Sequence, residues 1–152
     1  MKIAHSASIR VFCSEEENEE VTNGLKWLVP LDFEKEKIRI NRQMALGFGD
    51  RKIVILEVSL TKEKQVKAFL DSLIQRLPET QKHLLLKQLD SRIDDQANFF
   101  IRVEKEILIK RSDLLVTDGG NCYHIKIKIA AFPSTKEKAL EAVKAFLTKE
   151  RA

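Results

Sequence analysis

The sequence predicts an α+β fold: a two-layer sandwich with one mixed, largely antiparallel sheet and helices packed on one of its faces. Several segments alternate between apolar and polar residues, which is typical of strands with one buried and one solvated face. Other segments carry apolar residues at the spacing of a single helix face. The chain has 152 residues, of which 43% are hydrophobic and 33% charged, so a single domain spanning 1–152 can bury a substantial core.

The first elements expected along the chain are a strand and a helix. Residues 2–12 alternate with period two, which predicts a half-buried strand. Ser14 followed by Glu17 forms a capping box, because each side chain can bond the backbone N–H of the other residue. We expect the helix that begins here to extend to about Val29, since Pro30 cannot continue it.

Two strands and a second helix follow. We expect a strand near 36–43, a turn at 47–50, and then the most apolar strand, 53–60, at the centre of the sheet. Thr61 is expected to cap the next helix. Its apolar stripe follows helical spacing and consists of Val66, Phe69, Leu70, Leu73, Ile74 and Leu77.

The second half of the chain begins with a short helix. It is expected to start at Pro78 and to extend through Leu89. The segment 98–103 alternates as a strand. The pattern of 104–117 is ambiguous, and one interpretation is a turn followed by a short strand at 114–117.

The clearest strand lies near the end of the chain. The sequence Asp-Gly-Gly-Asn at 118–121 predicts a hairpin turn, and 122–132 then alternates with period two. Ser134 and Glu137 form a second capping box, which predicts the last helix. The expected order is therefore βαββα(α)β(β)βα, with helices on one face because strands buried on both faces would be continuously apolar.

The face of the sheet away from the helices is expected to be open. Alternation assigns to it six basic side chains, one acidic side chain and two phenylalanines, because successive residues of a strand point to opposite faces. The expected open-face residues are Arg10, Phe12, Lys37, Arg39, Ile53, Ile55, Glu57, Phe100, Arg102, His124, Lys126 and Lys128.

Three interpretations of such a face remain open at this point. Single-stranded RNA could use it, with phosphates paired to the cations and unstacked bases lying on the rings. The face could instead be simply solvated, with long Lys and Arg stems shielding a few apolar residues. It could also be a protein interface, because exposed Ile53, Ile55 and Phe100 would form an apolar patch.

The positive charge of the chain is concentrated in one segment. The whole sequence has 27 Lys and Arg against 23 Asp and Glu, a net charge of +4. Residues 35–52 alone contain six basic and two acidic residues, which is the same surplus of four. Clustered basic residues are the electrostatic footprint of a nucleic-acid partner, although a surplus of this size is not sufficient evidence for one.

The sequence lacks the motifs of common catalytic and cofactor sites. It has no P-loop and no Gly-x-Ser-x-Gly elbow, and Gly47-Phe48-Gly49 leads into an expected strand, whereas a dinucleotide loop opens a helix. Cys122 and His124 lack the paired spacing of a zinc site. We therefore expect a non-enzymatic protein with no cofactor and no metal. No apolar run is long enough for a membrane helix, and the two cysteines are expected to be reduced thiols of a cytoplasmic protein.

A set of short segments extends along nearly the whole chain: 8–20, Gly47-Phe48-Gly49-Asp50 leading into 53–57, Arg92-Ile93-Asp94, 100–105, and 124–129 followed by Pro133. Together these segments resemble the archaeal predicted RNA-binding family that is described as exosome-associated. The resemblance is weakest over 105–121. It implies a fold similar to that of the ribosomal protein that binds the small RNA of the large subunit. It also implies RNA binding without catalysis and exosome subunits as partners.

The sequence thus favours a non-catalytic RNA-binding protein. The alternative is a protein–protein interaction module or homodimer that uses the open face without binding RNA. Base-stacking roles are predicted for Phe12 and Phe100. Phosphate-binding roles are predicted for Arg10, Lys37, Arg39, Arg42, Arg51, Lys52, Arg102, Lys126 and Lys128.

Overall fold

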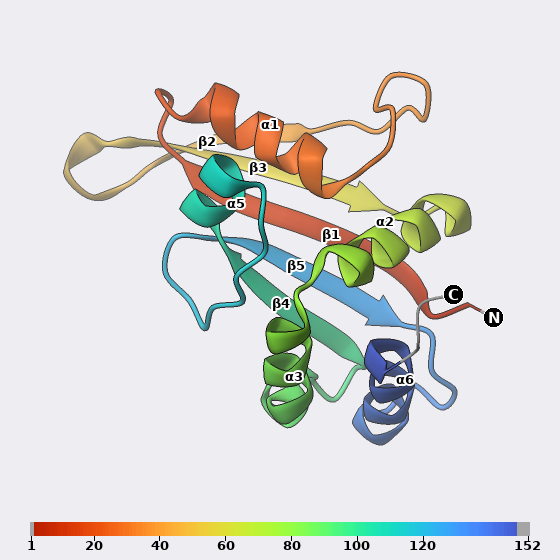
Figure 1. Ribbon diagram of the computed structural model, residues 1–152. Coiled ribbons are helices and arrows are strands. Elements are labelled where there is room, and N and C mark those ends of the chain that lie inside the picture. Colours follow the sequence, from red (N-terminus) through yellow and green to blue (C-terminus); the bar gives the residue numbers. More distant parts are fainter. Residues whose placement is uncertain (1, 149–152) are drawn as a thin grey trace.

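The structure, a computed structural model, describes residues 2–148 as a five-stranded sheet with helices on one face (Figure 1). The order across the sheet is β2-β3-β1-β5-β4, and all neighbouring strands are antiparallel. The predicted α+β sandwich is therefore confirmed. The strands are β1 (Ala4–Cys13), β2 (Asn41–Leu46), β3 (Lys52–Leu60), β4 (Asn98–Glu104) and β5 (Cys122–Ile129). The α-helices are α1 (Asn18–Leu28), α2 (Glu63–Arg76), α3 (Glu79–Lys87), α4 (Leu89–Arg92), α5 (Lys105–Arg111) and α6 (Lys136–Thr148).

The core lies between the sheet and the helix layer, as the alternating patterns predict. In β1, Ile9 and Val11 are fully buried while Arg10 between them is exposed. The apolar stripe of α2 enters this core through Phe69 and Leu73. Burial of such side chains stabilises the fold by about 1.5–3 kcal/mol each. None of the helices described in residues 2–148 is long and apolar enough to cross a membrane.

The centre of the sheet is β1, and the expectation that 53–60 is central was wrong. That segment forms β3, which pairs with β1 on one side and with the edge strand β2 on the other. β3 is strongly apolar because Val54 and Leu56 on its helix side are buried and Ile53 and Ile55 on its open side are half-buried. The apolar composition of β3 therefore reflects burial of side chains on both of its faces and not a position at the centre of the sheet.

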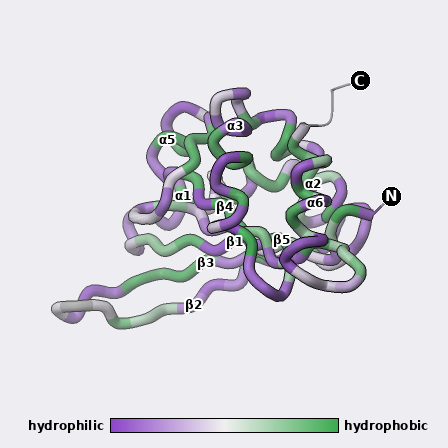
Figure 2. Tube along the Cα trace, turned by 90° about the horizontal axis from the view of Figure 1, so that it is seen from below, coloured by the Kyte–Doolittle hydropathy of each residue, from purple (hydrophilic) through white to green (hydrophobic). Residues whose placement is uncertain are grey.

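The second strand lies further along the chain than predicted. Residues 33–37 form turns, and Lys37 has a left-handed backbone (φ 57°) that ends any strand there. β2 begins only at Asn41, and all six of its residues are exposed. In Figure 2 the tip of the β2–β3 hairpin extends beyond the body of the molecule, and β2 is also an edge strand of the sheet. The predicted turn at 47–50 is confirmed at the tip, with a short 3₁₀ helix, η1 (Phe48–Asp50).

The ambiguous stretch 104–117 contains a helix that its sequence pattern did not predict. Glu104 ends β4, and its Oε2 accepts a hydrogen bond of 2.6 Å from the backbone N–H of Ile107, which caps α5. The expected short strand is reduced to a single bridge between Val103 and Val116. Residues 118–121 are a bend and not a hairpin turn, because α5 and its following loop connect the paired strands β4 and β5.

Helix starts were predicted to within a few residues. The Ser14–Glu17 capping box is present, with the Ser14 N–H donating to Glu17 Oε1 at 3.1 Å, but it closes a turn and α1 begins at Asn18. α2 begins at Glu63, and Thr61 does not cap it. At α6 the backbone N–H of Lys138 donates to the hydroxyl of Thr135 and not to that of Ser134.

Candidate nucleic-acid interface

The strand register arranges the open face into rows of side chains. Directly opposed residues of antiparallel strands point to the same side of the sheet, with Cβ atoms about 5 Å apart. One row, called here the lysine row, crosses β4, β5, β1 and β3 as Phe100, Lys126, Ser8 and Ser59. The next, called here the arginine row, crosses the same strands as Arg102, His124, Arg10 and Glu57.

The two arginines of the arginine row are held in different ways. Arg10 Nε lies 2.7 Å from Glu57 Oε2, so a carboxylate already compensates its charge. Arg102 Nη1 donates to the backbone carbonyl of Asp118 at 3.0 Å, and its Nε donates to His124 Nδ1 at 3.4 Å. A carbonyl and a neutral imidazole orient the guanidinium without neutralising it. Arg102 therefore keeps its charge for an external anion.

His124 lies between these arginines and is held in its neutral form. Burial lowers the pKa of its imidazole, and the positive charges of Arg102 and Arg10 lower it further. Its Nε2 lies 3.5 Å from the Cys122 thiol, and its ring meets that of Phe12 edge-on at a centroid distance of 6.1 Å. These contacts fix the Phe12 ring, which is 43% exposed.

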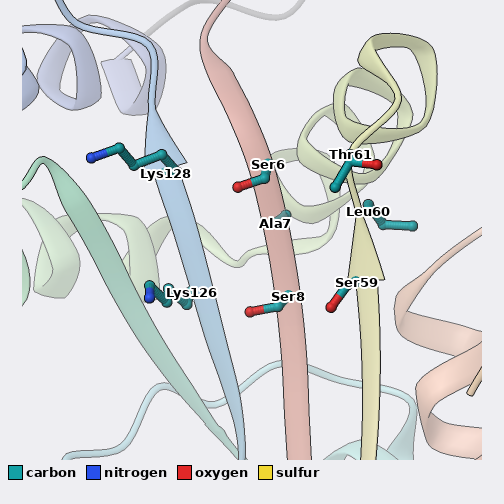
Figure 3. A pocket seen from close by; sticks show the side chains of 8 residues that line it. All are labelled: Ser6, Ala7, Ser8, Ser59, Leu60, Thr61, Lys126 and Lys128. Atoms are coloured by element: carbon teal, nitrogen blue, oxygen red, sulfur yellow. The ribbon is translucent and has the colours of Figure 1, made fainter. Parts of the chain in front are cut away.

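Two shallow hollows indent the open face. One has a volume of about 210 Å³ and lies between β5, β1 and β3, where Ser6, Ser8, Ser59, Lys126 and Lys128 line it (Figure 3). The other, of about 290 Å³, lies beside the arginine row. Its lining consists of Arg10, Asn41, Arg42, Gln43, Ile55 and Glu57.

The structure brings together six of the eleven side chains predicted to bind RNA. They come from three neighbouring strands and share the open face because their positions follow the predicted alternation. These six are Arg10, Phe12, Phe100, Arg102, Lys126 and Lys128.

The remaining five lie elsewhere. Lys37 and Arg39 precede β2, so their assignment to a strand of the open face was wrong. Arg42 borders the second hollow, but it pairs with Leu56, whose side chain is buried under the helices, so the Arg42 side chain points to the opposite side of the sheet. Arg51 and Lys52 are exposed at the far end of the β2–β3 hairpin.

The serines of the first hollow were missed as site residues. Ser6 and Ser8 alternate with buried residues of β1, which was a local signal for the open face. Ser59 stands beside Ser8 only through the pairing of β1 with β3, a contact between residues 51 positions apart. Within residues 2–148 no group of three or more His, Cys, Asp or Glu side chains could hold a metal ion.

Comparison with known proteins shows the family of this chain. A family model described as RNA binding matches residues 6–131, so the chain belongs to this archaeal RNA-binding family. RNA-binding protein PAB1135 from Pyrococcus abyssi is 25% identical over 148 residues, covering 97% of this chain and 96% of that protein.

Solved structures show the same fold. Protein AF2318 from Archaeglobus fulgidus is 25% identical with a TM-score of 0.81, covering 94% of this chain and 99% of that one. Mth689 from Methanothermobacter thermautotrophicus is 22% identical with a TM-score of 0.78, covering 95% and 98%. A UPF0201 protein from Methanococcus jannaschii, at 11% identity and a TM-score of 0.55, shares the fold more distantly.

Proposed function

We propose that this protein binds single-stranded RNA on its open sheet face without catalysing a reaction. The observation that carries the proposal is the gathering of Arg102, Lys126 and Lys128, none of them paired with a carboxylate among residues 2–148, beside the rings of Phe12 and Phe100. Membership of an RNA-binding family supports the ligand class. Cations hold phosphates, and the rings offer stacking surfaces for unpaired bases.

Single strands suit this surface better than a duplex. Stacking on Phe12 and Phe100 requires bases that are already unstacked, because a duplex hides the faces of its bases. The aromatic rings and cations are spread across β1, β5 and β4, so an extended strand can cross the sheet and use both. The polar hollows beside them accept sugar and phosphate groups.

Fluorescence anisotropy with a labelled single-stranded RNA, titrated across a salt series, tests the proposal. Three to four phosphates neutralised on the open face predict a log–log salt slope of about −2 to −3, at about −0.7 per phosphate. The double variant Lys126→Glu, Lys128→Glu is expected to bind more weakly and with a flatter slope. Unchanged affinity in this folded variant would contradict the use of the open face.

The interaction-module alternative predicts a different result. If no RNA binds even at low salt and the mass in light scattering rises with concentration, the open face or the exposed edge strand β2 joins two protein chains instead. The exosome subunits implied as partners, and a cytoplasmic location, stay predictions. Co-purification of exosome subunits with the tagged protein after nuclease treatment tests the first of these.

A further inference from the structure

The hollow between β5, β1 and β3, called here the serine hollow, exists because small side chains occupy interior positions of the sheet. Ser6 and Ser8 lie on the central strand, and Ser59 is directly opposed to Ser8. Interior strand positions favour β-branched and aromatic residues, which fill a pleated surface. Serines here leave a depression of about 210 Å³ between the taller side chains of their neighbours. Figure 3 shows the hydroxyls of Ser6 and Ser8 on the side of β1 that faces β5.

The hydroxyls of the serine hollow have unused hydrogen-bonding capacity. The hydroxyls of Ser6, Ser8 and Ser59 form no hydrogen bond with any group of residues 2–148. The hydroxyls of Ser14, Ser91 and Ser134 each form at least one. A serine hydroxyl offers one donor and two acceptor positions. Three such groups that converge on one depression can together bind the oxygens of an anion.

The charge around the serine hollow is positive. Lys126 is exposed and has no hydrogen-bond or ion-pair partner among the described residues, while Lys128 donates to the Gln96 carbonyl and the Ser134 hydroxyl, which are both uncharged. No Asp or Glu from the described part of the chain, 2–148, lines the hollow. Burial opposes the lowered pKa of the nearby Asp94 carboxyl, while hydrogen bonds from the amides of Asn98 and Gln96 and, to a smaller extent, the charge of Lys126 lower it. Asp94 and Lys126 form no ion pair. The hollow therefore combines hydroxyl donors with positive charge that no ion pair within residues 2–148 neutralises.

We propose that the serine hollow is a phosphate subsite, in which the hydroxyls of Ser6, Ser8 and Ser59 and the ammonium of Lys126 bind one phosphodiester of RNA while a base of the same strand stacks on Phe100. Phe100 is opposed to Lys126, and Lys126 to Ser8, so ring, cation and hydroxyls follow one another along the lysine row. The volume is below the 300–1,000 Å³ or so of pockets that bury drug-sized molecules, which suits a single phosphate group. This inference rests on the proposed RNA binding and names one of its subsites.

Two variants separate the roles of hydroxyl and charge. The double variant Ser8→Ala, Ser59→Ala removes two neutral donors, so RNA affinity is expected to fall about five- to tenfold with an unchanged salt slope. Lys126→Gln removes a charge, so affinity falls and the slope flattens by about 0.7. Ser72→Ala and Lys64→Gln on α2 remove the same groups from the helix side and are expected to bind as the unaltered protein does. Circular dichroism and thermal melting confirm that each variant is folded.

The outcomes distinguish the subsite from the function it rests on. If the unaltered protein binds RNA and the double serine variant binds equally well, the phosphate subsite is wrong and RNA binding stands. If the unaltered protein binds no RNA at low salt, both proposals fall. Titration with inorganic phosphate, followed by amide chemical shifts in NMR, is expected to perturb Ser6, Ser8 and Ser59 in the unaltered protein. Such shifts combined with unaffected RNA binding in the double variant would assign the hollow to a free anion and overturn the proposal.

Discussion

Replacement of Glu57 by Gln is expected to strengthen RNA binding, a gain that damage to the fold cannot imitate. Glu57 is the carboxylate that pairs with Arg10 at 2.7 Å in the arginine row of the open face. Its side chain is 30% exposed and that of Arg10 is 56% exposed, so the pair contributes only about 0–1 kcal/mol to stability. The substitution keeps the shape of the side chain, removes one negative charge and releases the Arg10 guanidinium for a phosphate.

The size of the gain follows from one additional phosphate contact. A charge-assisted hydrogen bond at a half-exposed arginine, discounted for solvent screening to about 1 kcal/mol, corresponds to about fivefold tighter binding. The log–log salt slope should steepen by about 0.7. The advantage of Glu57→Gln over the unaltered protein should therefore shrink as salt rises. Between 50 and 200 mM salt, a fourfold change, the ratio of their RNA affinities should fall by a factor of about 2.6.

The assay is anisotropy of a labelled single-stranded RNA at four or more salt concentrations, with Asp71→Asn as the matched control. Asp71 pairs with Lys67 at the same distance of 2.7 Å, but on α2 in the helix layer. The control raises the net charge of the protein by the same one unit and is expected to leave the slope unchanged. An equal gain in both variants would mean that the effect comes from net charge and not from Arg10. Weaker or unchanged binding by Glu57→Gln would refute the assignment of Arg10 to the RNA surface.

Three further predictions concern stacking, packing and pH. Phe100→Leu is expected to lose about 1–3 kcal/mol of RNA affinity with little change in salt slope, because it removes a stacking surface and no charge; a flatter slope in the salt series would contradict this. Gly24→Ala should destabilise the fold by about 1–3 kcal/mol in urea denaturation. The Cβ atom of the new alanine would overlap the Tyr123 hydroxyl, which donates a hydrogen bond of 2.8 Å to the Val21 carbonyl. Adding Tyr123→Phe should recover part of that loss, and a stabilised single variant would disprove the clash. The pKa of His124 is lowered in the fold, so the unfolded chain binds more protons below pH 6.5 and the free energy of unfolding decreases as pH falls through this range; His124→Gln should lose this component, as urea titrations at pH 7.5 and 5.5 will show.

The sequence by itself determined which side chains of a strand share a face. In β1 and β5, Arg10, Phe12, Lys126 and Lys128 alternate with buried residues, and the structure confirms all four on the open face. This could be predicted because alternation is a local property of extended backbone: successive Cβ atoms point to opposite sides whatever the strand pairs with. The stripe of α2 was readable for the same reason, since helical spacing is also local.

Only the tertiary structure decided which of these side chains meet and which of their charges are compensated by an ion pair. Arg10 is neutralised because Glu57, 47 residues away in the chain, is its partner in the register. Lys37 and Arg39 do not reach the open face because β2 begins only at Asn41, where the chain first pairs with β3. Ser59 joins Ser8 in the serine hollow only through strand pairing. Register and strand order are set by contacts between distant segments, so a local pattern reports the face of a side chain but not its neighbours.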